Sequence, residues 1–293
     1  MWGIFICKKE KGRRRIKLKI REALQIAVKT MQAYQIEDVY TKARILLAHF
    51  LLISKEQLAL HSDDEIADSQ LIDYENAVQM ICFGKPIQYI TNEQEFMKMK
   101  FYVDENVLIP QPDTEILVEE TISCIQGEEI VLDLCTGSGA IAVSIAKYTK
   151  AHVTASDISN EAIQIAKKNA KKNKVVVNYV LSDLFENIQT KFDIIVSNPP
   201  YIETQVIATL SKEVQQEPHL ALDGGEDGLD FYRILAKQAD SCLLPGGYLL
   251  LEIGYHQKDA VISLFNDTKK YDKIECIQDL SKNDRVIKMK KKG

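Results

Sequence analysis

From Glu129 to the C-terminus, short apolar segments alternate with longer segments of helical periodicity, and this alternation restricts the fold more than any other feature. Strands that are apolar almost throughout and alternate with helices are typical of a parallel sheet covered on both faces. We therefore predict an α/β fold with a mostly parallel sheet. The predicted strands are 129–134, 152–157, 175–181, 192–197 and 248–253, and the predicted helices are 140–147, 161–172 and 229–242.

Two further apolar segments, 273–278 and 285–289, are separated by only a short polar turn. A parallel crossover needs a dozen or more residues, so strands joined by so short a link must pair antiparallel. We expect the sheet to end in an antiparallel C-terminal hairpin.

The N-terminal part of the chain has a different character. Residues 20–83 show helical spacing of apolar residues and contain neither glycine nor proline, which predicts a small helical bundle. After it, Phe101–Val103 and Val107–Ile109 flank a polar turn, which predicts a β-hairpin. The expected parts are a basic tail at 1–19, a helical domain at 20–90, a hairpin linker at 91–112 and the α/β domain at 113–293.

Composition excludes several classes of protein. The net charge of −5 argues against a protein held to nucleic acid by bulk positive charge, although the first 19 residues are strongly basic. No apolar stretch could span a bilayer, so we expect a soluble, cytoplasmic protein without a membrane partner. The six cysteines show no C-x-x-C spacing, so we expect free thiols and no metal site.

A glycine-rich loop follows the first predicted strand. It comprises Asp133, Leu134, Cys135, Thr136, Gly137, Ser138 and Gly139. Glycines let the backbone turn sharply and let a ligand approach closely, although an ordinary strand-to-helix turn would have the same appearance. The next strand ends in Asp157, where a carboxylate can accept from ribose hydroxyls or cap a helix. Asp183 and Leu184 follow the third strand, and they suit an adenine amino group and ring, with a cap again as the alternative.

The fourth strand ends in Asn198, Pro199, Pro200 and Tyr201, and this is the strongest local signal. Two successive prolines lack N–H groups and stop the strand abruptly at the carboxyl edge of the sheet, where ligands bind. The Asn198 side-chain oxygen and the Pro199 carbonyl can each accept one hydrogen of a planar NH₂ group and expose its nitrogen lone pair. Tyr201 could then pack on the flat face of the substrate. We predict catalysis mainly by positioning.

The loop, Asp157 and the Asn-Pro-Pro-Tyr motif resemble those of class I, Rossmann-like methyltransferases that modify amide or amino nitrogens. Further segments are similar to the peptide chain release factor glutamine methyltransferases, the HemK/PrmC family. These are Gly84–Ile90, Glu95-Phe96, Val107–Glu115, Glu217-Pro218, Ala221-Leu222, Gly224-Gly225, Asp227–Leu229, Tyr232-Arg233, Asp279 and Asp284–Val286.

The resemblance implies S-adenosylmethionine as the cofactor and class I release factors as the partner, with methylation at N5 of the glutamine in their Gly-Gly-Gln motif. The helical domain would recognise the release factor, and a monomer with no direct nucleic acid contact is expected. The cofactor would be bound by the residues of the loop (Asp133, Cys135–Gly139) with Asp157, Asp183, Leu184 and Asn198, and the glutamine by Asn198, Pro199, Pro200 and Tyr201.

Two positions depart from the family pattern. Gln111 stands where arginine is usual, which bears on how Glu115 is held, and Cys135 stands where glycine is common. The motifs also leave other functions open. These are a glutamine methyltransferase acting on a ribosomal protein, an adenine-N6 methyltransferase, a non-enzymatic binding module and a nicotinamide oxidoreductase.

Overall fold

The structure is a computed structural model that describes residues 18–293. It consists of two compact units: the chain up to residue 91 together with 212–216, and residues 92–211 together with 217–293. Most of the predicted basic tail, residues 1–17, lies outside the described residues. Leu18 and Lys19 do belong to the helical unit, because the Leu18 carbonyl accepts from the Ile66 N–H at 2.9 Å and Lys19 forms a β-bridge with Glu65.

The first unit is helical, as predicted. Its core forms where the apolar faces of three helices meet, and Ala23, Ala27 and Met31 line one face of α1 at the i, i+4, i+8 spacing. The buried Tyr74 hydroxyl donates to the Ala43 carbonyl at 3.2 Å and so links α4 to α2. The helices are α1 (Ile20–Ala33), α2 (Val39–Leu51), α3 (Gln57–Leu60), α4 (Asp68–Cys82) and α5 (Ile87–Thr91), with the short 3-10 helix Val214–Gln216.

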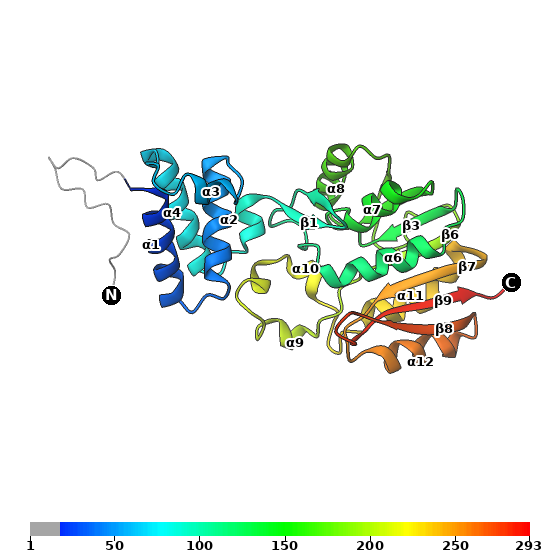
Figure 1. The fold of residues 1–293 in the computed structure, drawn as a ribbon. Helices are drawn as coiled ribbons and strands as arrows, with labels where there is room; N and C mark the ends of the chain where they lie inside the picture. Colours follow the sequence, from blue (N-terminus) through cyan, green and yellow to red (C-terminus); the bar gives the residue numbers. More distant parts are fainter. Residues whose placement is uncertain (1–17) are drawn as a thin grey trace. The chain divides into compact units, whose positions relative to one another are not determined.

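The second unit contains a seven-stranded sheet in the order β5-β4-β3-β6-β7-β9-β8 (Figure 1). Neighbouring strands from β5 to β7 are parallel, whereas β9 runs antiparallel to both β7 and β8. The predicted α/β fold and its antiparallel ending are therefore confirmed. The strands are β3 (Ile130–Leu134), β4 (His152–Asp157), β5 (Asn178–Leu181), β6 (Phe192–Ser197), β7 (Leu243–Glu252), β8 (Tyr271–Gln278) and β9 (Asp284–Lys291).

Helices cover both faces of this sheet. Alternate residues of each central strand face opposite sides, so that Leu249 and Leu251 join one core while Leu250 joins the other. The first core lies under α11 (Asp230–Cys242) and α12 (Lys258–Thr268). The second lies under α6 (Glu115–Ser123), α7 (Ala140–Tyr148) and α8 (Asn160–Asn173). The sequence did not indicate α6 or α12.

The order of the strands determines where along the sheet a ligand can bind. From β3 the chain moves outward through β4 to β5 and then returns to β6 on the other side of β3. The carboxyl ends of β3 and β6 therefore diverge at a topological switch point, where open α/β sheets bind ligands. The remaining short helices are the 3-10 turn Pro112–Thr114, α9 (Thr204–Ile207) and α10 (His219–Leu222).

The β-hairpin predicted at 101–109 was wrong in position. The hairpin is formed by β1 (Gln94–Phe96) and β2 (Met99–Phe101), joined by Met97 and Lys98 at φ of 49° and 58°. A two-residue turn with both φ positive is normally signalled by Asn-Gly or Asp-Gly, and the Met-Lys pair gives no such signal.

Residues 102–110 make no ladder because their backbone groups bond to side chains. The Tyr102 N–H donates to Asn169 at 2.6 Å, and the Ile109 N–H donates to Glu217 at 2.8 Å. The Val103 carbonyl accepts from Asn92 at 3.0 Å. Within residues 18–293, no helix has the length and apolar character needed to cross a membrane.

The Asn169 side chain makes three hydrogen bonds to backbone groups in this region. It is fully buried, and its amide group donates to the Tyr102 and Ser138 carbonyls at 2.9 and 2.8 Å besides accepting from the Tyr102 N–H. One side chain thus fixes the segment after the hairpin and the glycine-rich loop to α8.

We predict that Asn169→Leu lowers the free energy of unfolding by about 3 kcal/mol, because it leaves the buried Ser138 carbonyl and the partly buried N–H and carbonyl of Tyr102 without this partner. Urea denaturation measures the loss. Asn160→Leu at the exposed start of the same helix is the control and should change stability by no more than about 0.5 kcal/mol. Similar losses in both variants would contradict the role given to Asn169.

Candidate active site

The glycine-rich loop connects β3 to α7 at the switch point. Three of its residues have positive φ: Cys135 at 59°, Gly137 at 53° and Gly139 at 79°. The Thr136 N–H donates to the Ser156 carbonyl at 2.9 Å, and the Gly139 N–H donates to the Thr136 carbonyl at 2.8 Å. The loop is therefore a tight turn joined to the end of β4.

Asp133 supports the loop from behind. Its Oδ2 accepts from the Thr136 hydroxyl at 2.6 Å and from the Ala142 N–H at 3.1 Å, while Oδ1 has no partner among the described residues. Complete burial raises the pKa of Asp133 to about 7. This side chain stabilises the loop and does not reach the cavity in front of it.

Asp157 joins the tip of β4 to the loop. Its Oδ2 accepts from the Gly137 N–H at 2.8 Å and its Oδ1 from the Ser159 N–H at 2.9 Å. Burial raises the pKa of this carboxyl group. The N-cap of α8 is Ser159, whose hydroxyl accepts from Ala162, so Asp157 is not the capping residue.

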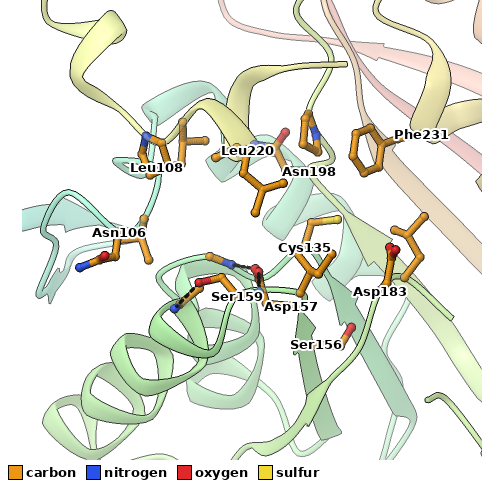
Figure 2. A pocket seen from close by; sticks show the side chains of 18 of the residues that line it. Asn106, Leu108, Cys135, Ser156, Asp157, Ser159, Asp183, Asn198, Leu220 and Phe231 are labelled. Carbon is orange, nitrogen blue, oxygen red and sulfur yellow. Dashed lines mark hydrogen bonds between the residues drawn. The ribbon is translucent and has the colours of Figure 1, made fainter. Parts of the chain in front are cut away.

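Cys135 and Gly137 of the loop, together with Asp157, line a cavity of about 550 Å³ at the carboxyl edge of the sheet. Its wall combines apolar residues with a few carboxylates and amides, the composition usual for a small-molecule site. Figure 2 shows Asp157, Asp183, Asn198 and Phe231 pointing into this common space. Its lining includes Glu105–Leu108, Cys135, Gly137, Ser156–Ser159, Ala162, Ser182–Leu184, Asn198, Pro200, Pro218, Leu220, Ala221, Phe231 and Ile234.

The Asn-Pro-Pro-Tyr segment begins directly after β6. The Ser197 hydroxyl donates to the Leu134 carbonyl at 2.8 Å, which fixes the last residue of β6 to β3. Asn198 is then half-buried at the cavity wall, and its Nδ2 donates to the Thr114 hydroxyl at 3.3 Å. Tyr201 packs against the core under α11, and its carbonyl accepts from Gln257 at 3.0 Å.

The predicted site residues fall into two groups. Those at the cavity wall are Cys135, Gly137, Asp157, Asp183, Leu184, Asn198 and Pro200. Those outside the lining are Asp133, Thr136, Ser138, Gly139, Pro199 and Tyr201. The sequence motifs did not indicate Thr114, the linker residues Glu105–Leu108, Phe231 or the buried Glu252. Glu252 could have been noticed, because it is a carboxylate at the end of an apolar strand, as Asp157 is.

The two departures from the expected pattern have local explanations. Gln111 donates to the Ile109 carbonyl at 3.0 Å, while Glu115 accepts from the Met97 N–H at 2.6 Å in the hairpin turn. Glu115 is therefore held without help from position 111. Cys135 occupies a left-handed conformation that favours glycine. Burial raises the pKa of its thiol, so the group stays protonated and is a weak nucleophile.

The two loop glycines provide a matched pair of variants. A Cβ at Gly139 would lie 2.9 Å from the Ala166 Cβ, whereas a Cβ at Gly137 would meet nothing within 4 Å. We predict that Gly139→Ala costs about 2–3 kcal/mol of stability and Gly137→Ala only about 1 kcal/mol from its positive φ. Urea denaturation compares them, and equal losses would show that the contact between the loop and α8 is unimportant.

Glu217 beside the cavity yields a prediction on pH. Burial raises the pKa of Glu217 to about 7, so the folded state loses stability as pH rises from its unfolded value near 4.5 through 7. Glutamine does not titrate but can still accept from Ile109. The stability of Glu217→Gln relative to the native chain should therefore rise by about 1–3 kcal/mol between pH 5 and pH 8. Thermal unfolding across this range tests it, with the exposed Glu226→Gln as the control for net charge.

Comparison with known proteins agrees with this site. Residues 111–226 match the family model described as "Methyltransferase small domain", and residues 22–91 match the "PrmC N-terminal domain". A crystal structure of a methyltransferase from Pyrococcus furiosus shares the fold, with a TM-score of 0.53 at 20% identity over 75% of this chain and 99% of that one.

Curated relatives have a higher sequence identity to this chain than that crystal structure has. The release factor glutamine methyltransferase of Clostridium acetobutylicum is 39% identical over 92% of this chain and 98% of its own length. That of Streptococcus pneumoniae is 41% identical over 73% of this chain and 77% of its own length. At such identity over nearly the whole sequence, the chain belongs to the release factor glutamine methyltransferase family.

Proposed function

We propose that this protein transfers a methyl group from S-adenosylmethionine to the side-chain amide nitrogen of the glutamine in the Gly-Gly-Gln motif of class I release factors. The observation that carries the proposal is the position of Asn198 at the end of β6. There its side chain reaches the wall of the cavity whose opposite part contains Asp157.

The cavity suits the cofactor in size and chemistry. Gly137 leaves open space where a side chain would project, and Leu184 and Phe231 offer apolar surface for an adenine ring. Asp157 would accept from the ribose hydroxyls, and Asp183 from the adenine amino group. When bound, S-adenosylmethionine supplies an electrophilic methyl group on its sulfonium.

The residues of the motif would orient the substrate amide. An amide nitrogen is a weak nucleophile because its lone pair is delocalised into the carbonyl group. The Asn198 side-chain oxygen and the Pro199 carbonyl would each accept one N–H of the glutamine, which holds the nitrogen and directs its lone pair toward the methyl group. Positioning of this kind can contribute about 7–11 kcal/mol to lowering a barrier.

The helical unit is the proposed recognition domain for the release factor. Its match to the PrmC N-terminal domain supports this assignment. A groove of about 380 Å³ between α1 and α2 is lined by the cations Arg21, Lys29 and Arg44 and by the exposed Tyr40. We infer a transient complex of a cytoplasmic, monomeric enzyme with its protein substrate.

Other target classes are less well supported. A ribosomal protein would need the same cofactor site, and only the helical unit would differ. An adenine-N6 methyltransferase would need basic surface near Asn198, yet Asp223, Glu226 and Asp227 follow the motif. A binding module or a nicotinamide oxidoreductase leaves the Asn198–Tyr201 segment without a role.

We predict that the enzyme labels a purified class I release factor with methyl-labelled S-adenosylmethionine, and that changing the Gly-Gly-Gln glutamine to alanine abolishes labelling. Asn198→Ala should lower kcat by about 100- to 1000-fold, the usual effect of removing one positioned hydrogen-bonding group. Calorimetry with the cofactor confirms that the variant still folds and binds. No labelling of the native factor by an enzyme that binds the cofactor would refute the release factor as substrate.

A further inference from the structure

A buried carboxylate lies next to the Asn-Pro-Pro-Tyr motif. In the parallel pairing of β6 with β7, Ser197 lies opposite Leu251. The next residues along the two strands are Asn198 and Glu252, so they are neighbours at the carboxyl edge of the sheet. Glu252 also ends the ladder with β9, where it pairs with Val286.

Burial of the Glu252 carboxylate at this position is energetically unfavourable. The residue is 2% exposed, and its Oε2 has no hydrogen-bond partner among the described residues. Removing a carboxylate from water costs several kcal/mol unless charges or hydrogen bonds compensate, and an apolar side chain of similar volume would often be more stable. Fold stability alone therefore does not explain Glu252.

The groups around Glu252 show what it can do. Hydrogen bonds from the Thr114 hydroxyl and from the Asn198 amide lower the pKa of its carboxyl group, although burial is the larger effect. Thr114 in turn accepts from Asn198 Nδ2 at 3.3 Å. The two hydrogens of Nδ2 thus have two acceptors, the Thr114 hydroxyl and the Glu252 carboxylate.

This arrangement determines which way the Asn198 amide faces. An asparagine side chain presents an oxygen on one side and an NH₂ group on the other, and the neighbours decide its orientation. Nδ2 donates one hydrogen to Thr114 at 3.3 Å, and a second bond from Nδ2 to Glu252 would leave Oδ1 to face the cavity. Only that orientation offers an acceptor to a substrate NH₂ group.

We propose that Glu252 is a positioning residue that fixes the orientation of the Asn198 amide so that its oxygen accepts from the substrate amide. This inference rests on the proposed function. Glu252 acts through Asn198 and does not itself touch the substrate.

Other charged and titratable groups face this carboxylate. Arg285 and Asp113 come from β9 and from the turn before α6, and Arg285 is paired with Asp113 at 3.0 Å and with Asp279 at 3.1 Å. Tyr201 hydrogen-bonds to the Glu252 side chain, and the Tyr232 hydroxyl donates to the Glu252 carbonyl at 2.8 Å. Burial raises the pKa of both hydroxyls. Arg285 therefore remains charged and the tyrosines neutral while Glu252 titrates.

The position of Glu252 has a consequence for pH. Burial raises the pKa of Glu252 to about 7. As pH falls through this value the carboxylate gains a proton, and its capacity to accept from Asn198 Nδ2 decreases. The single-turnover rate of the native enzyme should fall toward low pH with an apparent pKa near 7.

The test is a double-mutant cycle on single-turnover methyl transfer, with Glu252→Gln, Asn198→Ala and the double variant. Glutamine has nearly the same shape but presents an NH₂ group and does not titrate. We expect Glu252→Gln to lower the rate by about 10- to 100-fold, with cofactor affinity unchanged by calorimetry and the acid limb of the pH profile removed. In the Asn198→Ala background the same change should have less than a twofold effect.

Glu217→Gln is the matched control, since Glu217 is also a buried carboxylate with a pKa raised to about 7. Glu217→Gln should change the single-turnover rate by the same factor in the native enzyme and in the Asn198→Ala background. A rate for Glu252→Gln within twofold of native, or an equal loss in both backgrounds, overturns the proposal. Transfer by the native enzyme in the same assay separates this outcome from failure of the proposed function.

If Glu252→Gln does not fold, the proposal is tested by the pH dependence of the single-turnover rate of the native enzyme and of Asn198→Ala. An acid limb near pH 7 that is present in the native enzyme and absent in Asn198→Ala supports the proposal. An acid limb that persists without Asn198, or is missing from the native enzyme, refutes it.

Discussion

The abrupt end of β6 is the constraint on which the site depends. Two prolines follow Asn198, and because they have no N–H groups the ladder with β3 and β7 cannot continue. The Ser197 hydroxyl bonded to the Leu134 carbonyl fixes the last paired residue. Asn198 therefore projects from a fixed point at the centre of the sheet, beside the loop after β3 and the end of β7.

Much of this could be predicted from the sequence, because most of the central strands are largely apolar and lead into polar residues. The strands His152–Asp157 and Phe192–Ser197 were predicted to the residue, and seven of the predicted site residues line one cavity. Helix α6 was not predicted, because its apolar residues, Ile116, Leu117, Val118 and Ile122, lie in a segment of nine residues that closely follows two prolines. Local periodicity is informative where burial is continuous and weak where it is not.

What the sequence did not indicate depends on contacts between distant residues. The segment after β2 is extended but unpaired, because Asn169 and Glu217 take the bonds that a second strand would have taken. Glu252 is separated from Asn198 by more than fifty residues, and only the parallel pairing of β6 with β7 brings them together. Partners of this kind follow from topology and register, which a single sequence does not specify.

The helical unit is not a single segment of chain, and this affects how such proteins can be recombined. Residues 212–216 belong to it although they are inserted in the methyltransferase unit, and Glu213 forms an ion pair with Lys42 at 2.5 Å. The chain therefore passes between the two units three times. An exchange of recognition domains between relatives at residue 91 alone would separate this short insert from its partners. Domain exchange that preserves the fold must transfer both pieces together.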